Sequence, residues 1–239
     1  VMFEYVLGTP VLRGVDLRIE PGEHVAVVGQ TGGGKSSLMH LLAGLYVPDS
    51  GTIQIGGYDP RSLEASQRRK LIGVVPQHVH LFEGTLLENL RLGNEEISED
   101  EVWTALDLSN AGSLVRGFAD GLDTPLGVSG LTLSAGQRQL LALARALVGD
   151  PRLLLMDEAT SSIDSETERL IQDGLERSSS GRTTLAVAHR LSFGEETDRV
   201  IVMRDGQIVE EGAPDVLASG AGWFAGMIEL QRRGWTDER

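Results

Sequence analysis

A glycine-rich segment, GQTGGGKS at residues 29–36, has the residue types and the spacing that bind phosphate oxygens. It fits the pattern G-x-x-x-x-G-K-[ST] and lies between a β-branched run at residues 25–29 and a leucine-rich stretch of helical spacing at residues 36–45. Glycines let backbone N–H groups approach an anion closely, and a helix N-terminus adds partial positive charge. We therefore expect Lys35 to reach the β- and γ-phosphates of a nucleotide and the Ser36 hydroxyl to ligate Mg²⁺.

The competing interpretation of this segment is a glycine-rich turn that contains Lys-Ser by chance. The order strand, loop, helix favours the phosphate loop. The residues of the loop that we expect to contact the nucleotide are Gly29, Thr31, Gly32, Gly33, Gly34, Lys35, Ser36 and Ser37.

Two consecutive carboxylates, Asp157 and Glu158, follow the apolar run RLLLM. Acids at the end of a buried strand are unfavourable unless a cation or a partner is present. Asp157 suits the Mg²⁺ ligand that pairs with the loop serine, and Glu158 suits a general base for an attacking water. By themselves the two acids are more often solvated strand ends, and the phosphate loop favours the catalytic interpretation. His189 follows a further apolar run, residues 183–188. A histidine there usually packs or caps, but a place at the end of a strand beside the acids favours a functional role.

The elements that must position these groups are short apolar runs alternating with helical patterns. Four such runs, at residues 25–29, 71–75, 152–157 and 183–188, predict buried strands of a largely parallel sheet that is covered on both faces. The segment at residues 198–212 predicts a hairpin that turns at Asp205-Gly206, with helices after it.

Between residues 94 and 147 the pattern is mostly helical, and Ser98 followed by Glu-Asp-Glu begins a helix as an N-cap with acids in the first turn. We expect one domain over residues 1–239. Roughly residues 1–93 and 148–239 would form its catalytic core with a β subdomain, and roughly residues 94–147 an inserted helical subdomain.

The composition limits the classes of partner. Lys plus Arg number 21 and Asp plus Glu 35, a net charge of −14, which argues against duplex DNA because DNA-binding proteins usually carry a basic surface. The absence of cysteine excludes disulfides, thiolate metal sites and cysteine nucleophiles. No run of eighteen apolar residues occurs, so no membrane span is expected within the sequence. The chain begins with an apolar strand pattern at Val1, which indicates a piece of a longer polypeptide.

The run LSAGQRQLLALARAL at residues 133–147 resembles the LSGGQ signature of ATP-binding cassette (ABC) proteins. The other motifs of that family stand in order over nearly the whole chain: Tyr5, the phosphate loop, Gln77 in VPQ, the acids of LLLMDE, SSID at residues 161–164, and His189. The segments at residues 74–93, 158–168 and 182–192 resemble exporter-type transporters of subfamily B. The resemblance implies a P-loop NTPase fold with a mostly parallel central sheet, an antiparallel β subdomain and an inserted α-helical signature subdomain.

The resemblance also implies roles that spacing cannot give. Tyr5 would stack on adenine, and Gln77 would sense Mg²⁺ and the γ-phosphate. His189 would align the catalytic water with Glu158, and Asp164 would report across a dimer. The signature residues Ser134, Gly136 and Gln137 would bind the γ-phosphate of ATP held by a second domain. The expected metal ligands are thus Ser36, Gln77 and Asp157, and the expected catalytic residues are Lys35, Gln77, Glu158 and His189.

The implied function is that of a Mg²⁺-dependent ATPase at the cytoplasmic face of the cell membrane, which pairs head to tail with a second such domain and drives export through transmembrane domains. The alternatives are a soluble ABC ATPase acting on ribosomes or DNA and a regulatory ATP-binding domain with weak hydrolysis. Two departures bear on this function. Ala135 replaces the middle glycine of the signature, and Val128 stands where glutamate is usual in the exporter segment, departures common in heterodimeric exporters.

Overall fold

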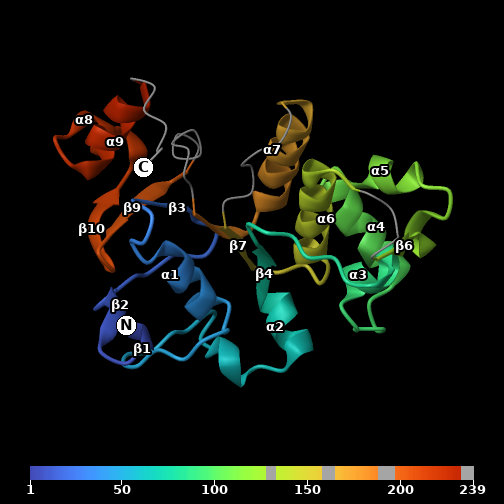
Figure 1. The fold of residues 1–239 in the computed structure, drawn as a ribbon, viewed down its shortest axis with the longest axis horizontal. Coiled ribbons are helices and arrows are strands. Elements are labelled where there is room, and N and C mark those ends of the chain that lie inside the picture. The colour runs from blue at the N-terminus through green and yellow to red at the C-terminus, as the bar shows by residue number, and fades with distance from the viewer. Residues whose placement is uncertain (128–132, 158–164, 188–196, 233–239) are drawn as a thin grey trace. The chain divides into compact units, whose positions relative to one another are not determined.

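A computed structural model describes residues 1–127, 133–157, 165–187 and 197–232 (Figure 1). The chain divides into two compact units. The first unit consists of Val1–Ser62 and Thr183–Arg239, and the second unit of Leu63–Arg182.

The strands of the first unit surround β3 (His24–Val28), an apolar and mostly β-branched run that is buried from Val25 to Val28. Its neighbours are parallel: β8 (Thr183–Val187) on one side and β9 (Arg199–Arg204) on the other. The strand β10 (Gln207–Gly212) continues antiparallel from β9. Two further strands, β1 (Met2–Val6) and β2 (Thr9–Arg13), form a separate antiparallel pair. The predicted strands at residues 25–29 and 183–188 are therefore confirmed.

The predicted hairpin is also confirmed. Asp205 and Gly206 connect β9 to β10 with φ values of 49° and 78°, the two positive angles that a tight hairpin turn requires.

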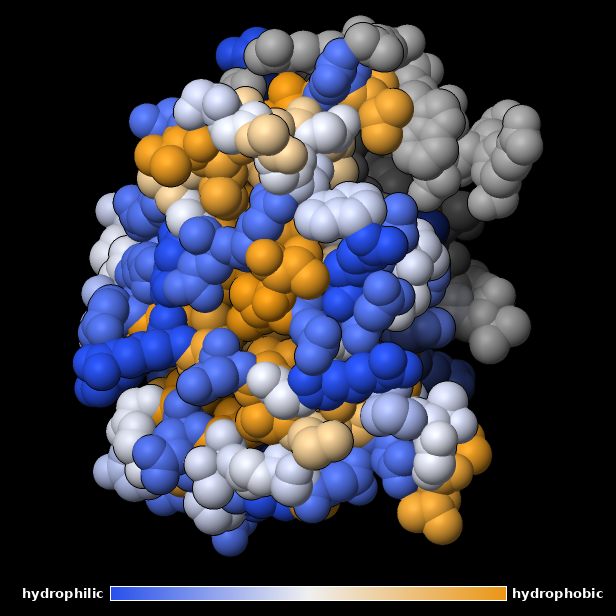
Figure 2. All heavy atoms as spheres, turned by 90° about the vertical axis from the view of Figure 1, so that its left-hand side faces the viewer, coloured by the Kyte–Doolittle hydropathy of each residue, from blue (hydrophilic) through white to orange (hydrophobic). Residues whose placement is uncertain are grey.

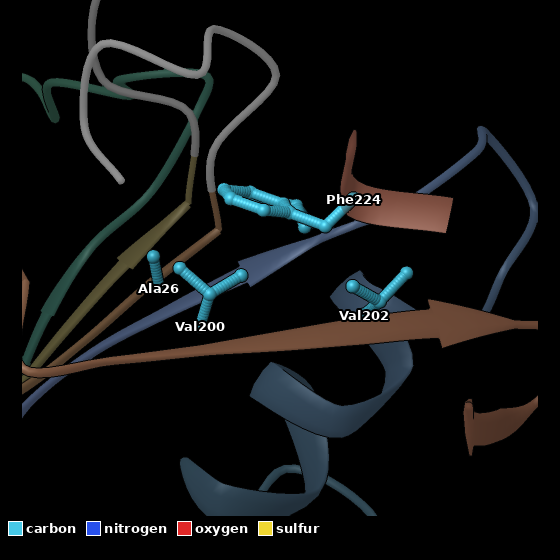
Figure 3. Packing of buried hydrophobic residues seen from close by; sticks show 5 residues of the cluster. Ala26, Val200, Val202 and Phe224 are labelled. Atoms are coloured by element: carbon cyan, nitrogen blue, oxygen red, sulfur yellow. The ribbon is translucent and has the colours of Figure 1, made fainter. Parts of the chain in front are cut away.

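The hydrophobic core on one side of these strands is closed by the C-terminal helices α8 (Pro214–Ser219) and α9 (Trp223–Arg232). The ring of Phe224, only 2% exposed, packs over small side chains that the strands present on one face: Ala26, Val28, Val200 and Val202 (Figure 3). The Glu210 carboxylate accepts hydrogen bonds from the backbone N–H groups of Trp223 and Phe224 and so places a negative charge at the first turn of α9.

The first unit also carries α1 (Lys35–Leu42) and the short 3₁₀ turn η1 (Pro60–Ser62). On the face of the molecule in Figure 2, apolar side chains reach the surface between hydrophilic ones. Exposed apolar residues of this unit include Val6, Leu7, Val209 and Val216.

The second unit is built on a parallel pair, β4 (Ile72–Val75) and β7 (Leu153–Asp157), which confirms the other two predicted strands. Its helices, with one 3₁₀ turn, are α2 (Ala65–Leu71), α3 (Leu86–Arg91), α4 (Glu99–Leu108), α5 (Gly112–Arg116), η2 (Gly121–Asp123), α6 (Ala135–Leu147) and α7 (Ser165–Ser179). A two-residue antiparallel pair joins β5 (Gly84–Thr85) to β6 (Pro125–Leu126).

The second unit contains the helix N-cap that the sequence predicts. Ser98 is the N-cap of α4, as predicted: its side chain accepts from the N–H of Glu101, whose carboxylate accepts from the N–H of Ser98. Gly73 lets α6 lie against β4, because a Cβ at Gly73 would overlap the carbonyl oxygen of Ala146.

Parallel strands with helices packed on them confirm the predicted α/β class with a mostly parallel sheet and an added antiparallel pair. The division at residues 93 and 147 stays a prediction. Among the described helices, none combines the length and the apolar character needed to cross a membrane.

Candidate functional site

The predicted phosphate loop lies between β3 and α1, with the backbone conformations that its glycines permit. Gly29, Gly32 and Gly34 have φ values of 140°, 80° and 97°, a region that side chains with a Cβ rarely adopt. Gly34 is the N-cap of α1, and the first turn of that helix contains no acidic residue. The helix N-terminus therefore carries no competing negative charge against a phosphate.

Two glycines of the loop also lie close to neighbouring strands. A Cβ at Gly29 would overlap the carbonyl oxygen of Met203, and one at Gly34 would lie 2.7 Å from Leu12 Cδ2. At Gly32, in contrast, nothing lies within 4 Å of a Cβ, and that residue is exposed. The glycines thus divide into those that the protein presses against and one that faces outward.

Lys35 holds the loop in shape. It is 5% exposed, and its Nζ donates to the carbonyl oxygens of Gly29 at 2.7 Å and Gln30 at 3.0 Å. A buried ammonium bonded to the loop backbone keeps a positive charge beside the N–H groups that a polyphosphate would meet. This arrangement fits a nucleotide phosphate group.

The next two residues lie in the first turn of α1 on different sides: Ser36 is exposed and Ser37 is 7% exposed. A hydroxyl at Ser36 together with the oxygens of Asp157 and Gln77 would be a set of hard oxygen donors, which suits Mg²⁺. No group of three or more histidine, aspartate or glutamate side chains that could hold a metal occurs among the described residues. Ser36 belongs to the first unit and the other two residues to the second, so their meeting at one ion stays a prediction.

Gln77 and Asp157 come to the same edge of the β4–β7 pair. The strands are parallel with Val75 opposite Met156, so Asp157 directly follows that pair on β7 and Gln77 follows it by two residues on the chain leaving β4. Polar groups at the carboxyl ends of parallel strands are where ligands of open α/β sheets bind. The second unit therefore places these two predicted site residues at the carboxyl ends of neighbouring strands.

The signature residues begin α6. Ser134 is its N-cap: the Ser134 Oγ accepts from the N–H of Gln137 at 3.1 Å, and Gln137 Oε1 accepts from the N–H of Ser134 at 2.9 Å. Ser134 and Ala135 are exposed, while Gly136 is buried. The S-x-x-Q spacing of a capping box is legible in the sequence, but it was not among the predicted features.

The loop after Gln77 is fixed by two side chains that the sequence analysis did not single out. Asn89 is 3% exposed; its Oδ1 accepts from the N–H of Phe82 at 2.7 Å, and its Nδ2 donates to the carbonyl oxygens of Phe82 and Thr85, both at 2.9 Å. Arg145, on α6, donates from Nη1 to the His80 carbonyl at 2.8 Å. Burial lowers the pKa of the Arg145 guanidinium from its usual value.

Tyr5 lies on β1, 47% exposed. Its hydroxyl is 3.2 Å from Nδ1 of His40, which belongs to α1, and its ring lies edge-on to the rings of Phe3 and Tyr46. Of the other predicted site residues, Glu158, Asp164 and His189 lie outside the described residues, as does Val128.

Comparisons with known proteins agree with this geometry. The family model described as ABC transporter matches residues 12–161. The chain is 45% identical over 227 residues to the mitochondrial potassium channel ATP-binding subunit of Xenopus tropicalis. The aligned region covers 95% of this chain and 33% of that protein. It is 41% identical over 232 residues to the ATP-dependent lipid A-core flippase of Chromobacterium violaceum, covering 97% of this chain and 40% of the flippase.

Among solved structures, a bacterial Atm1-family ABC exporter with ATP bound superposes with a TM-score of 0.86 at 34% identity, over 100% of this chain and 41% of the exporter chain. The chain thus spans a third to two fifths of the length of these relatives. A matching family model over more than half of the residues, together with the phosphate loop and the capped signature helix, leaves one assignment: the chain belongs to the ABC transporter family, as a nucleotide-binding domain of the exporter type.

Proposed function

We propose that this chain binds and hydrolyses ATP as the motor domain of an exporter. The observation that carries the proposal is the phosphate loop, with Lys35 buried behind three glycines of positive φ at the start of α1. Exporter-type relatives support this function over a soluble ATPase acting on ribosomes or DNA and over a regulatory domain with weak hydrolysis.

The residues divide the work by chemistry. The loop N–H groups and Lys35 hold the β- and γ-phosphates, and Tyr5 stacks on the base. Mg²⁺, held by Ser36, Asp157 and Gln77, would supply charge neutralisation at the phosphate oxygens. Glu158 accepts a proton from the attacking water, and His189 orients that water.

The partners follow from the signature helix. The Ser134 hydroxyl lies at an exposed position at the N-terminus of α6, where the positive end of the helix faces outward. We propose that the hydroxyl and this helix end bind the γ-phosphate of ATP held by a second nucleotide-binding domain, identical or not, so that two domains enclose ATP head to tail with Asp164 at their contact. Transmembrane domains complete the transporter, with this domain at the cytoplasmic face of the membrane.

The test is ATP binding by the purified chain and by Lys35→Ala. We expect the unaltered chain to bind Mg-ATP and the variant to lose binding at least tenfold, because the buried ammonium beside the loop is removed. Thermal unfolding of both proteins shows whether the variant is folded. Equal ATP affinity in a folded Lys35→Ala variant would refute the phosphate-loop assignment.

A further inference from the structure

Tyr5 is connected to the phosphate loop through a short series of contacts within the first unit. Gly34, at the end of the loop, packs against Leu12 of β2, and Leu12 is paired with Phe3 of β1. The ring of Phe3 in turn lies 4.7 Å from that of Tyr5, centroid to centroid. These contacts, from Gly34 to Leu12, from Leu12 to Phe3 and from Phe3 to Tyr5, connect the end of the loop to the Tyr5 ring.

A second route reaches Tyr5 from α1. His40 follows Lys35 by five residues, which places it about 7.5 Å further along the helix axis. His40 and Ser36 share one side of α1, since they are four residues apart. The Nδ1 of His40 meets the Tyr5 hydroxyl at 3.2 Å. The helix that begins at the phosphates thus also contacts the tyrosine.

Tyr46 supports the ring from the loop after α1. Its ring lies perpendicular to Tyr5, at 5.1 Å and an interplanar angle of 88°, and it also contacts the rings of Phe3 and His40. Asp49 ties this loop to β1: its Oδ2 accepts from the N–H of Glu4 at 2.7 Å, and its N–H donates to the carbonyl of Met2. Edge-to-face contacts between rings add roughly 0.5–1.5 kcal/mol to their burial and fix their relative orientation.

We propose that His40 and Tyr46 are positioning residues that set the angle of the Tyr5 ring and so determine how tightly the domain holds a purine base. The inference rests on the proposed function, in which Tyr5 stacks on the base. Because the hydrogen bond and the ring contacts come from α1 and from the loop that follows it, the base platform is held by the same helix whose N-terminus faces the phosphates. His40 acts through the Tyr5 hydroxyl, and Tyr46 through the Tyr5 ring.

The experiment is a double-mutant cycle on the full 239-residue chain, with dissociation constants measured for Mg-ATP and for inorganic tripolyphosphate. Tyr5→Phe and His40→Phe each remove the hydrogen bond and keep the ring. We expect each to weaken ATP binding roughly two- to tenfold, the range of one net hydrogen bond, and the double variant to be no weaker than either single one. Tripolyphosphate, which lacks a base, should bind all of them equally.

Two further variants sharpen the test. His40→Gln keeps a polar group that can pair with the hydroxyl and should restore most of the ATP affinity. Tyr58→Phe, which removes the hydroxyl of another exposed tyrosine in this unit, is the matched control and should leave ATP binding unchanged.

The outcomes separate the two proposals. If the losses of ATP affinity caused by Tyr5→Phe and His40→Phe multiply in the double variant, or if tripolyphosphate binding weakens equally, the positioning role is overturned. The proposal that the chain binds ATP would still stand in that case. An unaltered chain that binds tripolyphosphate and ATP with the same affinity would overturn the base platform. An unaltered chain that binds neither would overturn the proposed function itself.

Discussion

Individual glycines of the phosphate loop differ in what they tolerate. Gly29 and Gly32 both have positive φ, but only Gly29 is pressed against another backbone segment, the carbonyl of Met203. At Gly29, both a steric overlap and the backbone conformation disfavour a side chain. At Gly32, only the backbone conformation does. The pattern G-x-x-x-x-G-K-[ST] treats its glycines alike and does not contain this difference.

We expect Gly29→Ala to lower the free energy of unfolding by about 2–5 kcal/mol, the sum of a left-handed backbone penalty and an overpacking penalty. Gly32→Ala should lower it by about 1–2 kcal/mol, since only the backbone penalty applies. Urea unfolding of the two variants and the unaltered chain measures both values. Equal destabilisation by the two substitutions would show that the contact with Met203 does not constrain the loop.

The sequence predicts the residues that carry out chemistry better than the residues that hold them in position. Lys35 and Asp157 are legible because their types and spacing match a reaction, and the structure places Lys35 against the loop. Asn89, Arg145 and His40 are not legible in that way, because an asparagine, an arginine or a histidine within a helical pattern is compatible with many environments. Their roles depend on backbone carbonyls and rings that only folding brings near them.

Between elements, Asn89 joins α3 to the loop that carries Gln77. Its amide makes three hydrogen bonds to the backbone of Phe82 and Thr85 and is almost completely buried. A leucine at this position has the same branched outline, a larger volume and no polar group. We expect Asn89→Leu to lower the free energy of unfolding by about 2–4 kcal/mol, because buried backbone donors and acceptors lose their partners.

The control for Asn89 is Asn94→Ala. The Asn94 side chain accepts one hydrogen bond, from the N–H of Glu96, at an exposed position. We expect it to cost less than about 1 kcal/mol. Urea unfolding compares the two, and protease cleavage between β4 and β5 reports whether the loop has loosened. An Asn89→Leu variant as stable as Asn94→Ala would contradict the anchoring role.

Elements with strong apolar patterns are the ones that the sequence predicts. The strands β3, β4, β7 and β8 are runs of apolar, often β-branched residues, and each lies within about one residue of its expected bounds. The two-residue strands β5 and β6 carry no such pattern, since Gly84–Thr85 and Pro125–Leu126 pair only because the tertiary fold brings them together. Local pattern therefore determines the sheet, and tertiary contacts determine the short connections around the site.

For the whole molecule, the proposed head-to-tail pairing makes one residue serve two purposes. Ser134 caps α6 in its own chain and, in the proposed dimer, faces the γ-phosphate bound by the partner. Alanine at this position would remove both properties together, since loss of an N-cap costs about 1 kcal/mol. A substitution that keeps the cap and changes only the charge separates them.

Aspartate is such a substitution, because it caps helices as well as serine and is favoured at a helix N-terminus. We expect the free energy of unfolding of Ser134→Asp to lie within about 0.5 kcal/mol of that of the unaltered chain. The variant should also bind ATP normally at its own phosphate loop. In the proposed dimer its carboxylate would meet the γ-phosphate of the partner's ATP, and repulsion between like charges should abolish ATP-dependent dimerisation. Light scattering with and without ATP measures the dimer, and equilibrium binding of ATP measures the loop.

Ser134→Asn provides the neutral comparison, since asparagine caps a helix equally well and carries no charge. If repulsion is the cause, the asparagine variant dimerises in the presence of ATP and the aspartate variant does not, while both retain the helix. Should both variants lose the dimer equally, the Ser134 hydroxyl rather than the local charge would be the essential group. If the aspartate variant dimerises as the unaltered chain does, the N-terminus of α6 does not face a nucleotide, because a carboxylate cannot approach a γ-phosphate without a large loss of affinity.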